Sequence, residues 1–235
     1  MDLLARLAED PTRAALFLDV DGVLAPIVPR PEDARVPDET REELRRLNER
    51  YALVACISGR AGADAQRIVG VPDLVYVGNH GLELDGEAAG WGERLQQFLA
   101  DVAWPATENK QLTASLHYRG SQDEGAARAA LEDIKTRAEH EGFVARFGRK
   151  VLELLPPLDV HKGTAVRHLL AERSLRRALY AGDDTTDLDG FRVLDGLDVS
   201  VRVAVASQES PPELREAADL VVANPEEFVS LLRRL

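Results

Sequence analysis

The stretch "LFLDVDGVLAPI", residues 16–27, begins as a strand and ends as a polar turn. Its first three residues are apolar and suit a strand buried on both faces. Asp19 and Asp21 follow at once, and Gly22 allows a turn that returns the second carboxylate over the strand end. A carboxylate can attack phosphorus, and a second acid two residues on can protonate the leaving oxygen. We therefore predict Asp19 as nucleophile and Asp21 as general acid and base, with a plain acidic turn as the alternative.

Apolar runs and helix-like segments alternate along most of the chain, which predicts an α/β fold with a parallel sheet. The expected strands are residues 16–18, 53–57, 74–77, 178–180, 201–205 and 220–222. The expected helices are residues 38–50, 61–69, 162–173, 213–218 and 226–235.

The middle of the chain departs from this alternation and predicts an inserted α+β domain. Its expected helices are residues 93–102 and 123–140, and its expected strands are residues 111–118, 143–147 and 151–155. The segments EAAGWG, residues 87–92, and LLPPLD, residues 154–159, are expected to be hinges. We place the core domain at residues 1–84 and 158–235 and the inserted domain at residues 85–157.

The composition restricts the classes of partner. The chain has 235 residues and a net charge of -12, and without a basic stripe it is not expected to bind nucleic acid. It has no apolar run long enough to cross a bilayer and no secretory signal at its start, so we expect no membrane partner. Its single cysteine, Cys56, lies in an apolar run and is expected to be buried and inert. These features favour a cytoplasmic protein, which we expect to be a monomer.

An acidic cluster follows the strand expected at residues 178–180. Asp183, Asp184, Asp187 and Asp189 lie too close together for an ordinary turn unless a cation compensates their repulsion. Magnesium fits, because it needs only one or two carboxylates beside a phosphate oxygen. We expect Asp183 to be a direct ligand and Asp187 a water-mediated or orienting one. The alternative is a helix start enriched in acids.

Two further segments offer phosphate-binding groups. Ser58 ends the second expected strand, and its hydroxyl and the following backbone N–H groups could hold phosphate oxygens. Lys162 opens a helix and could neutralise both the phosphate and Asp19. The alternatives are an ordinary strand end and a solvated lysine.

Together these segments resemble the haloacid dehalogenase superfamily of phosphotransferases, on the motifs DVDG, the serine of ISGR, the lysine of HKGT and GDDTTD. The resemblance implies a Rossmann-like core in which Asp19 forms a phospho-aspartyl intermediate. It also implies that Mg²⁺ is bound by Asp19, the carbonyl of Asp21 and the acid-loop residue Asp183. Val23 stands where the superfamily usually has threonine, which removes one hydroxyl.

More specifically, FLDVDGVLAPI, ISGR, VGNHGLEL, SLHYRG, HKGTAV and GDDTTDLDGF are similar to trehalose-6-phosphate phosphatases over nearly the whole chain. The resemblance implies that the insertion, between the second and third catalytic loops, is a C2-type cap that selects the leaving group. Residues implied to contact the distal glucose are Lys110, His117 and Glu153, and those implied to line the junction of core and cap are Arg60, Asn79 and His80.

Arg119 completes the expected sugar-binding set, because alternation along a strand at residues 111–118 would place it on the same side as His117. The alternative is an ordinary half-exposed strand end. Leu155 stands where many family members have arginine after Glu-x, so one sugar or phosphate contact is expected to be missing.

The function expected from the resemblance is Mg²⁺-dependent hydrolysis of trehalose 6-phosphate in trehalose biosynthesis. One alternative is another capped sugar-phosphate phosphatase, acting on sucrose phosphate or a glycosyl-phosphoglycerate. The other is a non-catalytic, sugar-phosphate-binding regulatory protein, against which the general acid Asp21 argues, because a pure binder does not need it.

Overall fold

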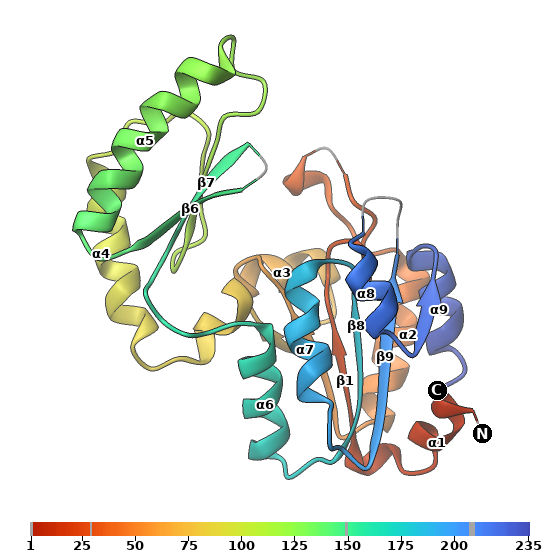
Figure 1. The fold of residues 1–235 in the computed structure, drawn as a ribbon. Coiled ribbons are helices and arrows are strands. Elements are labelled where there is room, and N and C mark those ends of the chain that lie inside the picture. The colour runs from red at the N-terminus through yellow and green to blue at the C-terminus, as the bar shows by residue number, and fades with distance from the viewer. Residues whose placement is uncertain (1, 29, 149, 207–209) are drawn as a thin grey trace. The chain divides into compact units, whose positions relative to one another are not determined.

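The structure is a computed structural model that describes residues 2–28, 30–148, 150–206 and 210–235. The chain forms two compact units, one made of Met1–Gly81 and Val160–Leu235 and the other of Leu82–Asp159. Each unit contains its own sheet (Figure 1). We call them the core unit and the inserted unit.

The sheet of the core unit has six strands in the order β10-β9-β8-β1-β2-β3, and neighbouring strands are parallel. The strands are β1 (Ala14–Leu18), β2 (Leu53–Ile57), β3 (Val75–Val77), β8 (Arg177–Gly182), β9 (Val199–Val205) and β10 (Leu220–Val222). Every residue of β1 is buried, as expected for a parallel strand covered on both faces. The predicted α/β class with a parallel sheet is confirmed.

The strand order places β1 and β8 side by side at the point where the chain changes direction across the sheet. From β1 the chain continues outward through β2 to β3, whereas from β8 it continues through β9 to β10 on the other side. Ligands of open α/β sheets bind at the carboxyl ends of the strands at such a point. Asp19 follows β1 and Asp183 follows β8 there.

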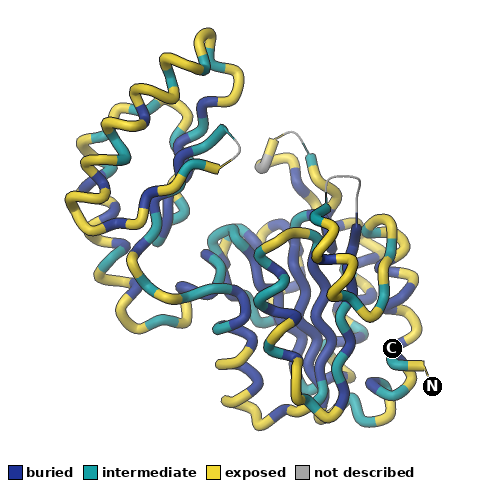
Figure 2. Tube along the Cα trace, viewed as in Figure 1, coloured by how far each residue is buried: buried dark blue, intermediate teal, exposed yellow. Residues whose placement is uncertain are grey.

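Helices cover both faces of this sheet, and Figure 2 shows the strands as the most buried part of the core unit. One face packs against α1 (Leu3–Ala8), α2 (Asp38–Arg50), α3 (Gly62–Val69) and α9 (Pro225–Leu232). The other packs against α6 (Lys162–Glu172), α7 (Leu188–Val193) and α8 (Pro212–Ala217). Short 3₁₀ helices lie at Pro11–Arg13, Pro31–Asp33, Asn79–Leu84 and Thr185–Asp187. Helix α1, which buries Leu4 and Leu7 in the core, was not among the expected helices.

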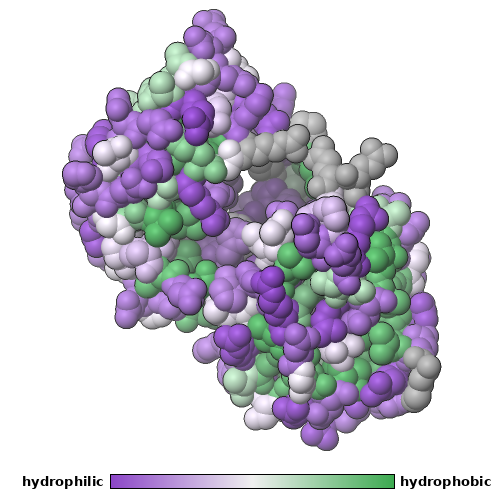
Figure 3. Space-filling model, viewed as in Figure 1, coloured by the Kyte–Doolittle hydropathy of each residue, from purple (hydrophilic) through white to green (hydrophobic). Residues whose placement is uncertain are grey.

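The inserted unit has an antiparallel sheet in the order β4-β5-β7-β6. Its elements are α4 (Ala88–Ala100), β4 (Thr107–Asn109), β5 (Ala114–His117), α5 (Glu124–His140), β6 (Val144–Gly148) and β7 (Val151–Leu155). Leu95 and Leu131 from the helices meet Leu116 and Leu152 in its core. Hydrophilic side chains cover the outer surface over α5 (Figure 3). No helix of the described residues has the length and apolarity to span a membrane.

Two local predictions in the inserted unit are wrong. Residues 87–92 were expected to be a hinge, but α4 begins at Ala88, where the ring of Trp91 packs edge-on against Phe143 with centroids 5.4 Å apart. Residues 111–118 were expected to be one strand, but Gln111 has a φ of 70° and turns the chain between β4 and β5. Because β5 ends at His117, Arg119 lies in the turn beyond it, and strand alternation does not place the two side chains together.

Candidate active site

The buried pair Asp19 and Lys162 lies at the carboxyl edge of the core sheet. The ammonium of Lys162 donates to Asp19 Oδ2 at 2.7 Å, and the N–H of Val20 donates to Asp19 Oδ1 at 2.7 Å. Lys162 is the first residue of α6, whose start is fixed by reciprocal hydrogen bonds between His161 and the first turn. The helix start therefore aims a buried cation at the carboxylate that ends β1.

Asp187 holds this lysine from the other side. Its Oδ1 accepts from Lys162 Nζ at 2.7 Å and from the Tyr180 hydroxyl at 2.8 Å. Its Oδ2 accepts the backbone N–H groups of Asp183 and Asp184 at 3.0 and 3.1 Å. Because four donors occupy the two oxygens of this fully buried carboxylate, its geometry suits an orienting role.

Asp19, Asp183 and Asp187 form a cluster in which one carboxylate oxygen from each residue lies within 4.8 Å of the other two. Gly22, at a φ of 78°, allows this approach, because a Cβ there would overlap the Asp183 carboxylate. Burial raises the pKa of Asp19 to about 7 despite the opposing effect of Lys162. Burial, together with the charges of Asp19 and Asp187, raises the pKa of Asp183 to about 8. A divalent cation would relieve the repulsion among the three carboxylates, so the residues fit a magnesium site.

The pKa of Lys162 is raised as well, but in a lysine this shift favours the charged form. Burial alone would lower its pKa, but the charges of Asp187 and Asp19 and their hydrogen bonds raise it above the usual value. Lys162 therefore stays positively charged at the centre of the cluster and balances part of its negative charge.

Asp21 points to a different partner. The guanidinium of Arg60 donates to both of its oxygens, from Nε to Oδ2 at 2.6 Å and from Nη2 to Oδ1 at 2.8 Å. The carboxylate of Asp21 is half-buried at the same edge of the sheet. Arg60, which the resemblance placed at the junction with the cap, therefore lies beside the predicted general acid.

The remaining predicted residues of the core unit follow β2 and β3. Ser58 is buried directly after β2, and Asn79 and His80 follow β3 with φ values of 50° and 56°. Backbone hydrogen bonds join the two loops, from Asn79 N to Arg60 O at 2.7 Å and from His80 N to Ser58 O at 2.9 Å. The loop that carries Ser58 is thus held in place by its neighbour.

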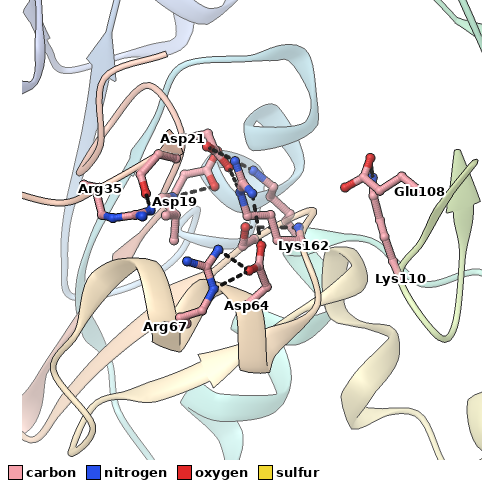
Figure 4. Close-up of polar contacts among 12 residues, drawn as sticks. Asp19, Asp21, Arg35, Asp64, Arg67, Glu108, Lys110 and Lys162 are labelled. Carbon is pink, nitrogen blue, oxygen red and sulfur yellow. Dashed lines mark hydrogen bonds and ion pairs between the residues drawn. The ribbon is translucent and has the colours of Figure 1, made fainter. Parts of the chain in front are cut away.

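The predicted sugar-binding residues of the inserted unit lie on or beside its sheet. Glu108, on β4, lies beside Lys110 (Figure 4), with 3.7 Å between its Oε2 and Lys110 Nζ. The same oxygen pairs with His117 Nε2 at 3.3 Å. Glu153, on β7, accepts from Arg146 Nε at 2.9 Å. Ser115 of β5 pairs with Glu108 on one neighbouring strand and with Glu153 on the other. Because paired residues point to the same side of a sheet, both glutamates lie on the face away from the helices. Arg119 is exposed in the turn after β5.

Three polar residues that make these arrangements were not among the predicted site residues. Tyr180 carries a hydroxyl within an otherwise apolar strand, which was a signal for a buried hydrogen bond. Asp64 stands four residues after Arg60 and three before Arg67, a spacing at which side chains on a helix meet. Glu108 offered no signal, because β4 itself was not predicted.

Solved structures define the class of this protein. The chain is similar to a haloacid dehalogenase-like hydrolase from Bacteroides thetaiotaomicron, with a TM-score of 0.61 and 15% identity over 94% of this chain and 98% of that one. It is also similar to trehalose-6-phosphate phosphatase from Aspergillus fumigatus, with a TM-score of 0.65 and 25% identity over 99% and 96%. The core unit with its acidic loops after β1 and β8 is thus a haloacid dehalogenase-like fold.

The chain belongs to the trehalose-phosphatase family, whose model matches residues 17–104 and 92–225. It is 31% identical to probable trehalose-phosphate phosphatase 3 of Oryza sativa subsp. japonica, over 94% of this chain and 68% of that protein. It is 34% identical to the trehalose-phosphate phosphatase of Mycobacterium avium (strain 104), over 77% of this chain and about half, 51%, of that protein. These findings confirm the predicted family and enzyme class, a phosphoric monoester hydrolase.

Proposed function

We propose that this protein hydrolyses trehalose 6-phosphate to trehalose and phosphate, with Mg²⁺ as cofactor and a phospho-aspartyl intermediate on Asp19. The observation that carries the proposal is the buried hydrogen bond between Lys162 and Asp19 beside the Asp183 carboxylate. This arrangement provides a nucleophile, a fixed cation and a second acid at the switch point of the sheet. Family membership supplies the substrate class.

In the first step a carboxylate oxygen of Asp19 forms a bond to phosphorus as the bond to the sugar O6 breaks. Asp21 gives its proton to O6, so the sugar leaves as a neutral alcohol. Lys162 and the Ser58 loop hold the non-bridging phosphate oxygens and balance their charge. Trehalose then departs and leaves the phosphoryl group on Asp19.

In the second step Asp21, now a carboxylate, takes a proton from a water molecule that attacks phosphorus. The bond between phosphorus and Asp19 breaks, and inorganic phosphate and the free carboxylate are regenerated. Lys162 stabilises Asp19 as the leaving group, because its ammonium already donates to that carboxylate. The same acid therefore serves both half-reactions.

Asp19, Asp183 and the backbone carbonyl of Asp21 would hold Mg²⁺, with Asp187 orienting the acid loop. When bound, the ion would neutralise negative charge on the phosphate oxygens. The raised pKa values of Asp19 and Asp183 support the proposal, because a cation is what this group of buried carboxylates needs.

For recognition of the sugar, we propose the polar sheet face of the inserted unit with Lys110, His117, Glu153 and the neighbouring Arg119. A disaccharide offers many hydroxyl groups, and fixed donors and acceptors discriminate against sugars that leave them unpaired. In the core unit, Arg60, Asn79 and His80 complete the proposed substrate-binding set. The proposal includes a cytoplasmic location and activity as a monomer.

The mechanism is tested with Asp19→Asn. We expect no turnover above background, because an amide cannot form the acyl phosphate, whereas the folded structure should persist by circular dichroism. Acid quenching of the wild-type protein during turnover should show a phosphoryl group on the peptide that contains Asp19. Substantial activity of a purified Asp19→Asn protein would contradict covalent catalysis.

The substrate is tested by phosphate release from a panel of sugar phosphates. Trehalose 6-phosphate should give the highest kcat/KM, ahead of sucrose phosphate, a glycosyl-phosphoglycerate and glucose 6-phosphate. Leu155 stands where many family members have arginine, so one expected contact with the substrate is missing. The panel therefore includes other sugar phosphates. A higher value for another member of the panel would reassign the substrate and leave the hydrolytic mechanism in place.

A further inference from the structure

A row of four charged side chains extends from the general acid into helix α3. Arg60 donates to Asp21 through Nε and Nη2, and its third nitrogen, Nη1, donates to Asp64 Oδ2 at 3.0 Å. Asp64 Oδ1 in turn accepts from Arg67 through Nε at 3.0 Å and Nη2 at 2.7 Å. Figure 4 shows Asp21 at one end of this row and Arg67 at the other. The charges alternate in sign along it.

Asp64 is held more firmly than an ordinary surface acid. It lies in the first turn of α3, where its negative charge also suits the helix dipole. Burial alone would raise its pKa, but hydrogen bonds from Arg67 and Arg60 lower it below the usual value. Asp64 therefore stays a carboxylate and offers Arg60 a fixed anchor.

Arg60 needs such an anchor, because an arginine side chain has several rotatable bonds. Its side chain is only 13% exposed, whereas those of Asp21 and Asp64 are 39% and 36% exposed. Asp21 binds one edge of the guanidinium and Asp64 binds the other, so the plane of the group is fixed on two sides. Loss of Asp64 would remove one of the two carboxylates that orient the plane.

We propose that Asp64 is a positioning residue for the general acid, which it orients through Arg60. The inference rests on the proposed function, in which Asp21 protonates the leaving sugar oxygen. Asp64 itself touches neither the substrate nor the reacting atoms. It sets the plane of the Arg60 guanidinium, and that plane sets the direction in which the Asp21 carboxyl faces.

This role predicts a dependence on the leaving group. An alkoxide from a sugar is a poor leaving group and needs the proton from Asp21, whereas p-nitrophenolate leaves without one. A misoriented acid should therefore slow the cleavage of trehalose 6-phosphate and have little effect on p-nitrophenyl phosphate. A general defect in folding or phosphate binding would slow both.

The test is kcat/KM of Asp64→Asn for the two esters. We expect a loss of about 10-fold for trehalose 6-phosphate and of less than about threefold for p-nitrophenyl phosphate. The first value is below the roughly 10²–10⁴-fold that general acid catalysis supplies, because Asp21 itself is still present. In the Asp21→Asn background, Asp64→Asn should cause no further loss, because an effect exerted through Asp21 disappears when Asp21 is absent. Equal losses for both esters, or a further loss in that background, would overturn the inference.

Asp38→Asn is the matched control. Asp38 also lies in the first turn of a helix and pairs with an arginine three residues on, at 2.9 Å. It shares with Asp64 the helix-start position and an arginine three residues on, but it has no link to Arg60, and we expect wild-type kcat/KM for both esters. A leaving-group effect in this variant would show that loss of a helix-start acid is sufficient to produce it.

A readout without turnover separates this inference from the proposed function. The Arg60 Nε–H signal in nitrogen-15 spectra, assigned with Arg60→Lys, should shift and exchange faster with water in Asp64→Asn and stay unchanged in Asp38→Asn. An unchanged signal in Asp64→Asn would overturn the inference even where the wild-type protein is active. A wild-type protein that hydrolyses neither ester would refute the proposed function, and the role of Asp64 as positioner of an acid would fall with it.

Discussion

At the scale of single residues, the candidate site is a cluster of buried side chains of opposite charge. Lys162 is a buried cation between Asp19 and Asp187, each at 2.7 Å, and the carboxylate of Asp183 lies beside them. A buried ammonium is tolerated only when carboxylates pair with it. The cluster nevertheless has more carboxylates than cations, and this excess has a measurable consequence.

The excess predicts how the stability of the metal-free protein depends on pH. The pKa values of Asp19 and Asp183 are raised from 3.8 to about 7 and about 8, so the folded state binds more protons than the unfolded state between about pH 4 and these values. The contribution of these two groups to the free energy of unfolding should therefore fall as the pH rises through this window. Thermal unfolding in a chelator, from about pH 5 to about pH 8, measures it.

Asp183→Asn is the control for this dependence. Its unfolding midpoint should fall less with rising pH than that of the wild-type protein, because one of the two shifted carboxyls is gone. Added Mg²⁺ should reduce the wild-type slope, since it binds the ionised carboxylates. A wild-type slope equal to that of Asp183→Asn would contradict the shift at Asp183.

At the scale of elements, β8 and α7 are packed around one aromatic ring. Tyr180 is fully buried on β8, and its ring meets Phe191 of α7 edge-on with centroids 5.8 Å apart. Gly190 of α7 leaves room for the ring, because a Cβ there would overlap it. The close approach brings the Tyr180 hydroxyl to Asp187, and through Asp187 to Lys162.

Gly190→Ala should therefore weaken both the packing and the site. We expect a loss of about 1–3 kcal/mol in the free energy of unfolding, because the added methyl group meets a rigid ring, together with a lower kcat as Asp187 is displaced. Urea unfolding and steady-state kinetics measure the two effects.

Gly90→Ala is the matched substitution. Gly90 lies within α4, and a Cβ there has no atom within 4 Å. Alanine should stabilise this helix by up to about 1 kcal/mol, because it loses less backbone entropy than glycine. If Gly190→Ala were as stable as Gly90→Ala, the packing argument would be wrong.

At the scale of the whole molecule, the two units present different chemistry. The core unit carries the carboxylates and the lysine, and the inserted unit carries a polar sheet face with Glu108, His117 and Glu153. If catalysis belongs to the first and selection of the sugar to the second, substitutions in the two units should have different kinetic signatures.

Glu153→Ala and His117→Ala test this division. Each should lower kcat/KM for trehalose 6-phosphate by about 10- to 100-fold, because a sugar hydroxyl loses its partner, and should leave p-nitrophenyl phosphate nearly unchanged. Glu132→Ala on α5, whose side chain is 49% exposed, is the control and should behave as wild type. Equal losses on both esters would contradict a role in recognition of the sugar.

Much of the fold could be predicted because its signals are local. Strands β2, β7 and β10 and helix α2 begin and end at the predicted residues, since their apolar runs and periodic patterns are bounded by polar residues. The pattern failed where long-range packing decides the structure. Helix α4 takes up a glycine-rich segment that Trp91 anchors to Phe143, and α1 becomes ordered because Leu4 and Leu7 reach the core.

The sequence by itself determined which residues are candidates for the chemistry: residue type and position single out the acids after β1 and β8, the lysine at the start of α6 and the serine after β2. Only the tertiary structure decided their partners. In the folded protein Lys162 hydrogen-bonds to Asp187 as well as to Asp19. Arg60 hydrogen-bonds to Asp21 and also to Asp64. The physical reason is that residue types and periodicity are properties of short segments, whereas hydrogen bonds between side chains depend on where folding brings distant segments together.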